Sequence, residues 1–211
     1  MKKILIFLSV FAWVSIGIIY AQESVEQYLL NLREPKEEDY IKLLYEGSQE
    51  NKVLAAKKLA ELGSDNVEVI DALVFGLQQG TVFVKREGGK VTNDYWDVRA
   101  TSAKALGDIG NDRVLPDLYT ALRYDRDNYV KSEVALAIGK MGKRDSIYEL
   151  SRAIEISNNS GADDILIRAC VEAIGEIGHR DGFVPLVEVM RGNYTRRIKL
   201  AARESLKKIR W

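Results

Sequence analysis

Apolar and small residues recur along the chain with the spacing of amphipathic helices, and the same segment repeats. From Val98 an apolar residue, a basic residue and a run of small residues lead to Leu-Gly-Asp-Ile-Gly, which ends at Gly110. The same order returns in segments 130–142 and 166–178, and weaker copies end at Gly63 and Arg210. A segment repeated in this way predicts a solenoid of stacked helical units.

Each unit is predicted to contain two antiparallel helices. The first helix ends at the last glycine of the motif, where a left-handed cap is needed. Its small residues, such as Ala137 and Ala173, are expected where neighbouring helices approach closely. The second helix is expected to begin behind the cap residues Asn66, Asp112 or Asp145. In the turn at 158–164, Asp163 or Asp164 is expected to cap the next helix.

The motif from Val98 to Gly110, V-R-x-x-x-A-x-A-L-G-x-I-G, resembles the HEAT-repeat family, in particular the short bacterial repeats of phycobilisome lyases. The resemblance covers roughly residues 50–211, as expected of such arrays. It implies an all-α, right-handed α-solenoid of about five helical pairs, with the second helix of each pair on the concave surface. It also implies a ladder between repeats, formed by Arg99, Lys131 and Lys199 with nearby Asp97 and Asp127.

The N-terminal residues have the pattern of a secretory signal peptide. Lys2 and Lys3 precede an apolar run over residues 4–20, and the small residue Ala21 precedes a polar stretch. This order predicts a signal peptide over residues 1–21 and a mature domain over residues 22–211. The expected location is outside the cytoplasm, in the bacterial periplasm. The alternative is an uncleaved signal that anchors the chain in the membrane.

Residues 22–49 are predicted to form N-terminal capping helices, one from Ser24 to Leu32 and one from Glu37 to Tyr45. The repeats then occupy residues 50–211. Acidic residues gather near the start of this region, whereas the last helix is strongly basic. The basic residues of that helix are Arg196, Arg197, Lys199, Arg203, Lys207, Lys208 and Arg210. The array is therefore predicted to be acidic at its N-terminal end and basic at its C-terminal end.

Composition narrows the classes of function. The chain has 31 basic and 31 acidic residues, and loss of Lys2 and Lys3 with the signal leaves a slight acidic excess. This balance gives no indication of nucleic-acid binding. Cys170 is the single cysteine, so no internal disulfide forms and the domain depends on packing. The polar turn at 158–164 lacks the spacing of a calcium loop. No metal or other cofactor is therefore expected.

His179, the single histidine, follows Gly178 at a position that holds Ser64, Asn111 and Lys143 in the other copies. A position this variable is expected to be ordinary turn surface. A catalytic role would need a nucleophile and an orienting acid, which no motif supplies. The Gly-x-x-Gly runs recur at helix ends, and this explains them as architecture rather than as phosphate loops. The chain is therefore predicted not to be an enzyme.

An insertion over residues 78–95 interrupts the repeats. Segments 81–86 and 90–92 flank Glu87-Gly88-Gly89, the composition of a β-hairpin with a glycine turn. A linker without a role is the alternative. Because the insertion carries apolar and basic residues that a linker does not need, it is predicted to contact a partner together with second-helix residues. The candidate site comprises Val82, Phe83, Lys85, Arg86, Tyr95, Trp96, Tyr119, Arg123 and Tyr124.

These observations predict an exported HEAT-like scaffold that binds a protein partner. Neither nucleic acid nor, once the signal is cleaved, a membrane is an expected partner. Two alternatives remain open. One is a membrane-anchored assembly factor with an uncleaved signal. The other is a lyase-like protein that handles a chromophore or ligand, an activity implied only by the family resemblance.

Overall fold

The structure is a computed structural model that describes residues 35–158 and 160–211. The chain divides into two compact units, Met1–Asp39 and Tyr40–Trp211. The predicted signal peptide and the helix predicted from Ser24 to Leu32 lie outside the described residues. Within the described residues no helix is both long and apolar enough to span a bilayer.

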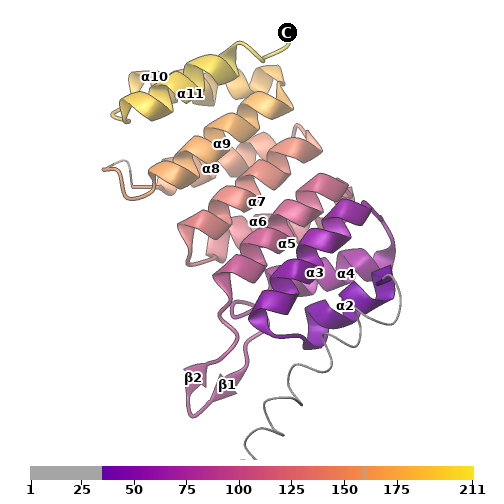
Figure 1. Cartoon of the computed structure of the whole chain (residues 1–211). Helices are drawn as coiled ribbons and strands as arrows, with labels where there is room; N and C mark the ends of the chain where they lie inside the picture. The colour runs from indigo at the N-terminus through magenta and orange to yellow at the C-terminus, as the bar shows by residue number, and fades with distance from the viewer. Residues whose placement is uncertain (1–34, 159) are drawn as a thin grey trace, which may run out of the picture. The chain divides into compact units, whose positions relative to one another are not determined.

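The described part of the chain contains ten α-helices, and from α3 onward they alternate between two layers (Figure 1). α2 (Glu37–Glu46) is the second capping helix expected from the sequence. The first layer holds α3 (Gln49–Leu62), α5 (Trp96–Ile109), α7 (Asn128–Met141), α9 (Asp164–Ile177) and α11 (Arg196–Leu206). The second layer holds α4 (Val67–Leu77), α6 (Leu115–Tyr124), α8 (Ser146–Ile156) and α10 (Phe183–Arg191). The predicted all-α solenoid of about five helical pairs is confirmed.

The core lies between the two layers and follows from the helical period of the apolar residues. Leu59, Leu106, Ile138 and Ile174 of the first layer are fully buried, and Leu118 of the second layer packs into the same core. Each repeat contributes its own apolar stripe, so the core runs continuously from repeat to repeat. Short 3₁₀ turns, Asp112–Val114 and Arg180–Gly182, lead into α6 and α10.

The second glycine of each motif ends a first-layer helix as predicted. Gly110, Gly142 and Gly178 have φ of 75°, 68° and 65°, in the left-handed region, and no heavy atom crowds the Cβ position of Gly110 or Gly142. Gly110 and Gly142 are therefore required by backbone conformation and not by lack of space, whereas at Gly178 the Lys208 carbonyl also lies 3.0 Å from the Cβ position.

The first glycine of each motif is required for a different reason, which is close helix packing. A Cβ on Gly107 would lie 2.6 Å from Cβ of Ala137, and one on Gly139 would lie 2.7 Å from Cα of Ala173. A Cβ on Gly175 would likewise clash with Ser205. The small residues predicted at helix contacts therefore lie there, and they let consecutive first-layer helices pack backbone against backbone.

The expected helix caps are partly wrong. Asp145 precedes α8 without a side-chain cap bond, and the residue that caps the turn before α6 is Asn111, not Asp112. Asn111 Oδ1 accepts a hydrogen bond from the Arg113 amide at 3.0 Å, and His179 Nδ1 accepts one from the Asp181 amide at 3.2 Å. The position after the glycine is thus a capping position in several copies, and His179 lies in an exposed turn as expected, where its side chain also caps.

Asp163 and Asp164 also differ from expectation, because they bond to neighbouring repeats. Asn128 Nδ2 donates to Asp163 at 2.6 Å, and Thr195 Oγ1 donates to Asp164 at 3.0 Å. At the junction between α3 and α5, Gln49 Nε2 donates to Asp97 at 2.8 Å. Asp97, Asp163 and Asp164, at the starts of α5 and α9, therefore each accept a bond from a neutral side chain of an adjacent repeat.

The ladder predicted from Arg99, Lys131 and Lys199 does not form with Asp97 and Asp127 in the described residues. Asp127 caps α7 instead. Ion pairs between repeats occur elsewhere, and Lys140 with Asp108 and Lys208 with Glu176 each join residues 32 positions apart. Because these pairs are exposed, each contributes little to stability, and their regular spacing records the repeat period.

The close contact between α5 and α7 makes stability sensitive to size at that point. We expect Ala137→Leu to lower the free energy of unfolding by about 1–3 kcal/mol, because the added atoms meet Gly107. Ala173→Leu should act similarly against Gly139. Urea unfolding followed by circular dichroism measures both changes. His179→Ala removes one exposed cap bond and should cost less, about 1 kcal/mol or below. Equal losses at Ala137 and His179 would contradict this packing.

Candidate functional site

The insertion between α4 and α5 forms the predicted β-hairpin. β1 (Arg86–Glu87) pairs antiparallel with β2 (Lys90–Val91), and the turn residues Gly88 and Gly89 have φ of 55° and 82°. Two positive φ angles are what a tight two-residue hairpin turn requires. The strands are shorter than the segments predicted from sequence. The side chain of Asn93 bonds the backbone of Phe83 and Lys85, and this holds that part of the insertion in turns.

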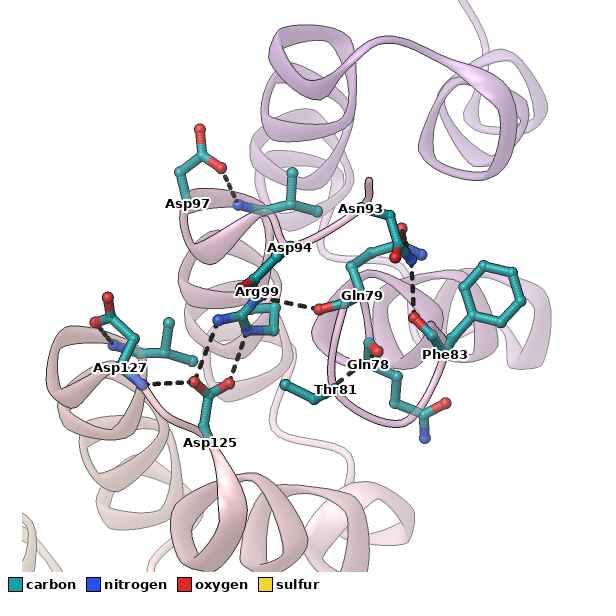
Figure 2. Close-up of polar contacts among 12 residues, drawn as sticks. Gln78, Gln79, Thr81, Phe83, Asn93, Asp94, Asp97, Arg99, Asp125 and Asp127 are labelled. Atoms are coloured by element: carbon teal, nitrogen blue, oxygen red, sulfur yellow. Dashed lines mark hydrogen bonds and ion pairs between the residues drawn. The ribbon is translucent and has the colours of Figure 1, made fainter. Parts of the chain in front are cut away.

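The base of the hairpin is held by a buried arginine, Arg99 of α5 (Figure 2). Its Nε donates to Asp125 at 2.7 Å, and its Nη1 donates to Asp94 at 2.6 Å and to the Gln79 carbonyl at 3.0 Å. The side chains of Arg99 and Asp125 are 2% and 1% exposed. Burial opposes the charge of Arg99, but the bonds to Asp125 and Asp94 outweigh it and raise its pKa.

Asn93 completes this base from the other end of the insertion (Figure 2). Its Nδ2 donates to the Phe83 carbonyl at 2.8 Å and to the Gln79 side chain at 3.2 Å, while its Oδ1 accepts from the Lys85 amide at 2.8 Å. Gly80, with φ of 71°, approaches so closely that a Cβ would lie 2.5 Å from Cα of Asp94. The two ends of the insertion are thus fixed to each other and to α5.

A row of aromatic rings supports the insertion from the side of α4. Phe75 lies 4.8 Å, centroid to centroid, from both Tyr45 and Phe83. Lys85 Nζ lies 5.9 Å from the Phe83 centroid. Phe83 therefore anchors the insertion by packing, and with 37% of it exposed it offers less surface to a partner than Val82 does.

Lys52 of α3 lies beneath this row, and it is largely buried. Its Nζ donates to the carbonyls of Leu44 and Tyr45 at the end of α2 and lies 5.5 Å from the Phe75 centroid. Burial, assisted by repulsion from Lys85, lowers its pKa to about 8. The contacts assign it a structural role at the end of a helix.

The structure brings together only some of the nine predicted site residues. Val82 and Tyr124, which are 62% and 73% exposed, line one pocket of about 290 Å³ between the insertion and α6. Lys85 and Arg86 follow Val82 in the chain, on the exposed hairpin, and do not line this pocket. We call the pocket and the adjoining hairpin, with these four residues, the hairpin pocket surface.

The other predicted residues serve elsewhere. Tyr95 packs against the core, and Tyr119 shares a hydrogen bond of 2.7 Å with Ser146. Arg123 forms a two-point ion pair with Glu149. Trp96 packs edge-on against Tyr129 at 5.7 Å in a hollow of the first layer, away from Val82. Sequence patterns show that these side chains are large, but not which of them already have partners.

Sequence reasoning missed two features of the surface. Arg126 and Asp117 also line the hairpin pocket, and only their spacing from Tyr124 on α6 and the turn after it could have indicated this. Two broad hollows of about 710 and 880 Å³ lie on the first layer and share Lys104 and Glu133. That the second helices lie on the concave surface stays a prediction, because hollows of about 290 and 460 Å³ also lie along the second layer.

Chemistry at the remaining candidate groups is limited. Cys170 is fully buried, and burial raises the pKa of its thiol to about 12, so it supplies no thiolate near neutral pH. His179 Nδ1 is engaged in capping a turn. Within residues 35–158 and 160–211, no cluster of three or more His, Cys, Asp or Glu side chains is arranged to hold a metal ion.

Comparisons with known proteins agree with the repeat architecture. Residues 90–162 match the family model for HEAT repeats, as the motif from Val98 to Gly110 indicated. The solved complex of CpcE and CpcF of phycocyanin lyase from Nostoc sp. PCC7120 is similar in fold, with a TM-score of 0.65 and 20% sequence identity. The match covers 85% of this chain and 66% of that one, just under two thirds of its length. No curated protein matches the chain in sequence.

The Arg99 contacts predict a local effect on the insertion. Arg99→Leu leaves Asp125 buried without its cation, so we expect a loss of about 3–5 kcal/mol. Arg99→Lys should restore only part of it, because an ammonium lacks the fork that reaches Asp125 and Asp94 together. Hydrogen exchange should rise first in residues 79–94. Exchange that rises evenly over all helices would contradict a role specific to the insertion.

The lowered pKa of Lys52 predicts how stability depends on pH. Between about pH 8 and pH 10.5 the unfolded chain binds a proton at Lys52 that the folded chain has released, so folding becomes more favourable as the pH rises. Lys52→Met removes this effect. The stability of the unaltered chain relative to Lys52→Met should therefore increase across this window in urea titrations, and a constant difference would show that the pKa is not lowered.

Proposed function

We propose that the chain is an exported, non-catalytic HEAT-repeat scaffold that binds a protein partner through the hairpin pocket surface. The observation that carries the proposal is the pairing of two exposed apolar side chains, Val82 and Tyr124, over one pocket. Large apolar groups exposed together on a rigid frame are typical of protein contacts.

The fixed base of the insertion supports this role. Arg99 and Asn93 hold the two ends of the insertion by buried hydrogen bonds, while the side chains above them face solvent. A loop ordered before binding loses less conformational entropy when a partner docks. A linker without a role would not need so many buried polar groups, because each must find a hydrogen-bond partner to offset its loss of water.

Charge indicates the kind of surface that fits. Lys85, Arg86 and Lys90 outnumber Glu87 on the hairpin, whereas at the pocket Arg126 is balanced by Asp117. This excess of positive charge favours a partner with carboxylates around an apolar or aromatic residue that enters the pocket. The similar fold in the phycocyanin lyase complex, in which CpcE and CpcF associate, supports partner binding as a use of such arrays.

Export rests on the basic, apolar and small-residue order of residues 1–21. N-terminal sequencing of the protein from its natural host should begin at Gln22. Retention of Met1 with the chain in the membrane fraction would favour the anchored alternative. A visible absorption band that co-purifies with the chain would favour the lyase-like alternative.

Photo-cross-linking tests the surface directly. A benzophenone amino acid placed at Val82 or at Tyr124 should capture the same protein in native cells, and one placed at Lys57 on α3 should not. Lys85→Glu with Arg86→Glu should remove the product at both positions while leaving the helical signal intact, because these side chains lie outside the core. Equal capture from Lys57, or capture unaffected by the charge reversal, would contradict the proposal.

A further inference from the structure

The side of α11 that faces away from α9 differs from the corresponding side of α5, α7 and α9. Val171 and Gly175 of α9 occupy the positions that face the next helix, and the matching residues of the last copy are Arg203 and Lys207. The same positions hold small residues in α5 and α7, namely Ala103, Gly107, Ala135 and Gly139. A helix therefore cannot pack on α11 as closely as α11 packs on α9.

The arginines on this side form no ion pair with any described residue, although Lys207 and, less strongly, Arg203 lower the pKa of Glu204. Arg196 and Arg203 lie two helical turns apart and are exposed, and neither forms an ion pair within the described part of the chain. By contrast, Lys207 pairs with Glu204, and Lys208 pairs with Glu176 of the preceding repeat. Lys207 and Lys208 therefore have carboxylate partners among the described residues, whereas Arg196 and Arg203 do not.

Apolar side chains lie next to these arginines. Leu200, which is 49% exposed, lies between Arg196 and Arg203 in the sequence of α11, and it also lines the hollow of about 880 Å³ on the first layer. Phe183 and Met190, 38% and 37% exposed, lie two turns apart on the adjacent helix α10 (Figure 1). Pro185 on the other side of α10 faces α8 across a shallow hollow, so Phe183 and Met190 lie on the side away from α8. The ring of Phe183 packs there against the ring of Trp211, at 5.2 Å between centroids.

We propose that this surface, formed by Arg196, Leu200, Arg203, Phe183 and Met190 and here called the basic outer face, binds an acidic helix of a protein partner. It is separate from the hairpin pocket surface and does not depend on it. Its composition is that of a protein interface, in which Arg, Met and aromatic residues are enriched. Its two arginines supply forked donors that fit paired carboxylates.

The contacts inside the array show which chemistry fits. Consecutive first-layer helices meet along small or apolar residues, with a cation and a carboxylate joining them at the edge, as Lys140 does with Asp108. The basic outer face offers the cations and the apolar residues but neither the carboxylates nor the small residues. A partner helix that provides carboxylates on either side of an apolar residue would complete it at a larger helix separation.

An anionic lipid surface is the competing ligand for such a face. It would attract lysine and arginine equally, because the attraction is one of net charge. Bidentate recognition of a carboxylate requires the guanidinium group. The choice between the two ligands can therefore be tested by exchanging arginine for lysine at constant charge.

The test uses the full mature chain and two labelled, blocked 18-residue peptides with leucine at helical spacing, one with glutamate and one with lysine at the flanking positions. Fluorescence anisotropy should show binding of the glutamate peptide only. Arg196→Glu with Arg203→Glu should weaken it at least tenfold, and Lys57→Glu, a charge reversal on α3, should change it less than twofold. Arg196→Lys with Arg203→Lys should weaken it several-fold.

Three results would overturn the proposal. The first is no binding of the glutamate peptide, or equal binding of both peptides. The second is binding that the double lysine variant leaves unchanged. The third is co-sedimentation with equimolar phosphatidylglycerol and phosphatidylcholine vesicles that follows net charge alone. In that case the double glutamate variant would lose co-sedimentation and the double lysine variant would keep it. Urea midpoints within error of the unaltered chain confirm that the variants are folded, since these side chains are exposed.

Discussion

The direct contact between helix backbones in the first layer is the constraint on which the rest of the structure depends. Gly107 meets Ala137, and Gly139 meets Ala173, at distances that leave no room for a further methyl group. Such contacts set the separation between repeats, and the separation sets which polar side chains reach across a junction. The bond from Asn128 to Asp163 spans the second of these junctions, and the bond from Thr195 to Asp164 spans the next one along the array. Packing therefore comes first, and the polar ladder follows from it.

The insertion shows how a loop is added to a repeat stack without loosening it. Arg99 occupies the basic position of the repeat motif, yet its charge is used inside the protein, where Asp125, Asp94 and the Gln79 carbonyl surround it. Because a buried guanidinium must be fully bonded, the segment that supplies its partners is held in one conformation. The residues above this base are then exposed and available for recognition, as binding residues often are on loops held by a rigid scaffold.

Charge is arranged differently within the array and at its basic outer face. Between repeats, cations such as Lys140 and Lys208 lie beside carboxylates of the preceding repeat. At the basic outer face the small residues give way to Arg203 and Lys207, which prevent close packing and leave positive charge exposed. Arg203 and Lys207 thus prevent another helix of the same repeat from packing closely on α11. They also form a surface that suits carboxylates.

The sequence by itself determined the class of fold, the repeat period and the hairpin, because helical periodicity, glycine at helix ends and a Gly-Gly turn are local signals. It did not determine the partners of the polar groups. Arg99 was expected to bond Asp97 or Asp127 and instead bonds Asp125, and the cap bond of His179 within its exposed turn was not expected. Likewise Phe83 and Trp96 looked equivalent to Val82 and Tyr124, but packing against Phe75 and Tyr129 removes them from the pocket. These outcomes depend on which side chains from distant repeats meet. The distance between helices decides that, and only the tertiary structure contains it.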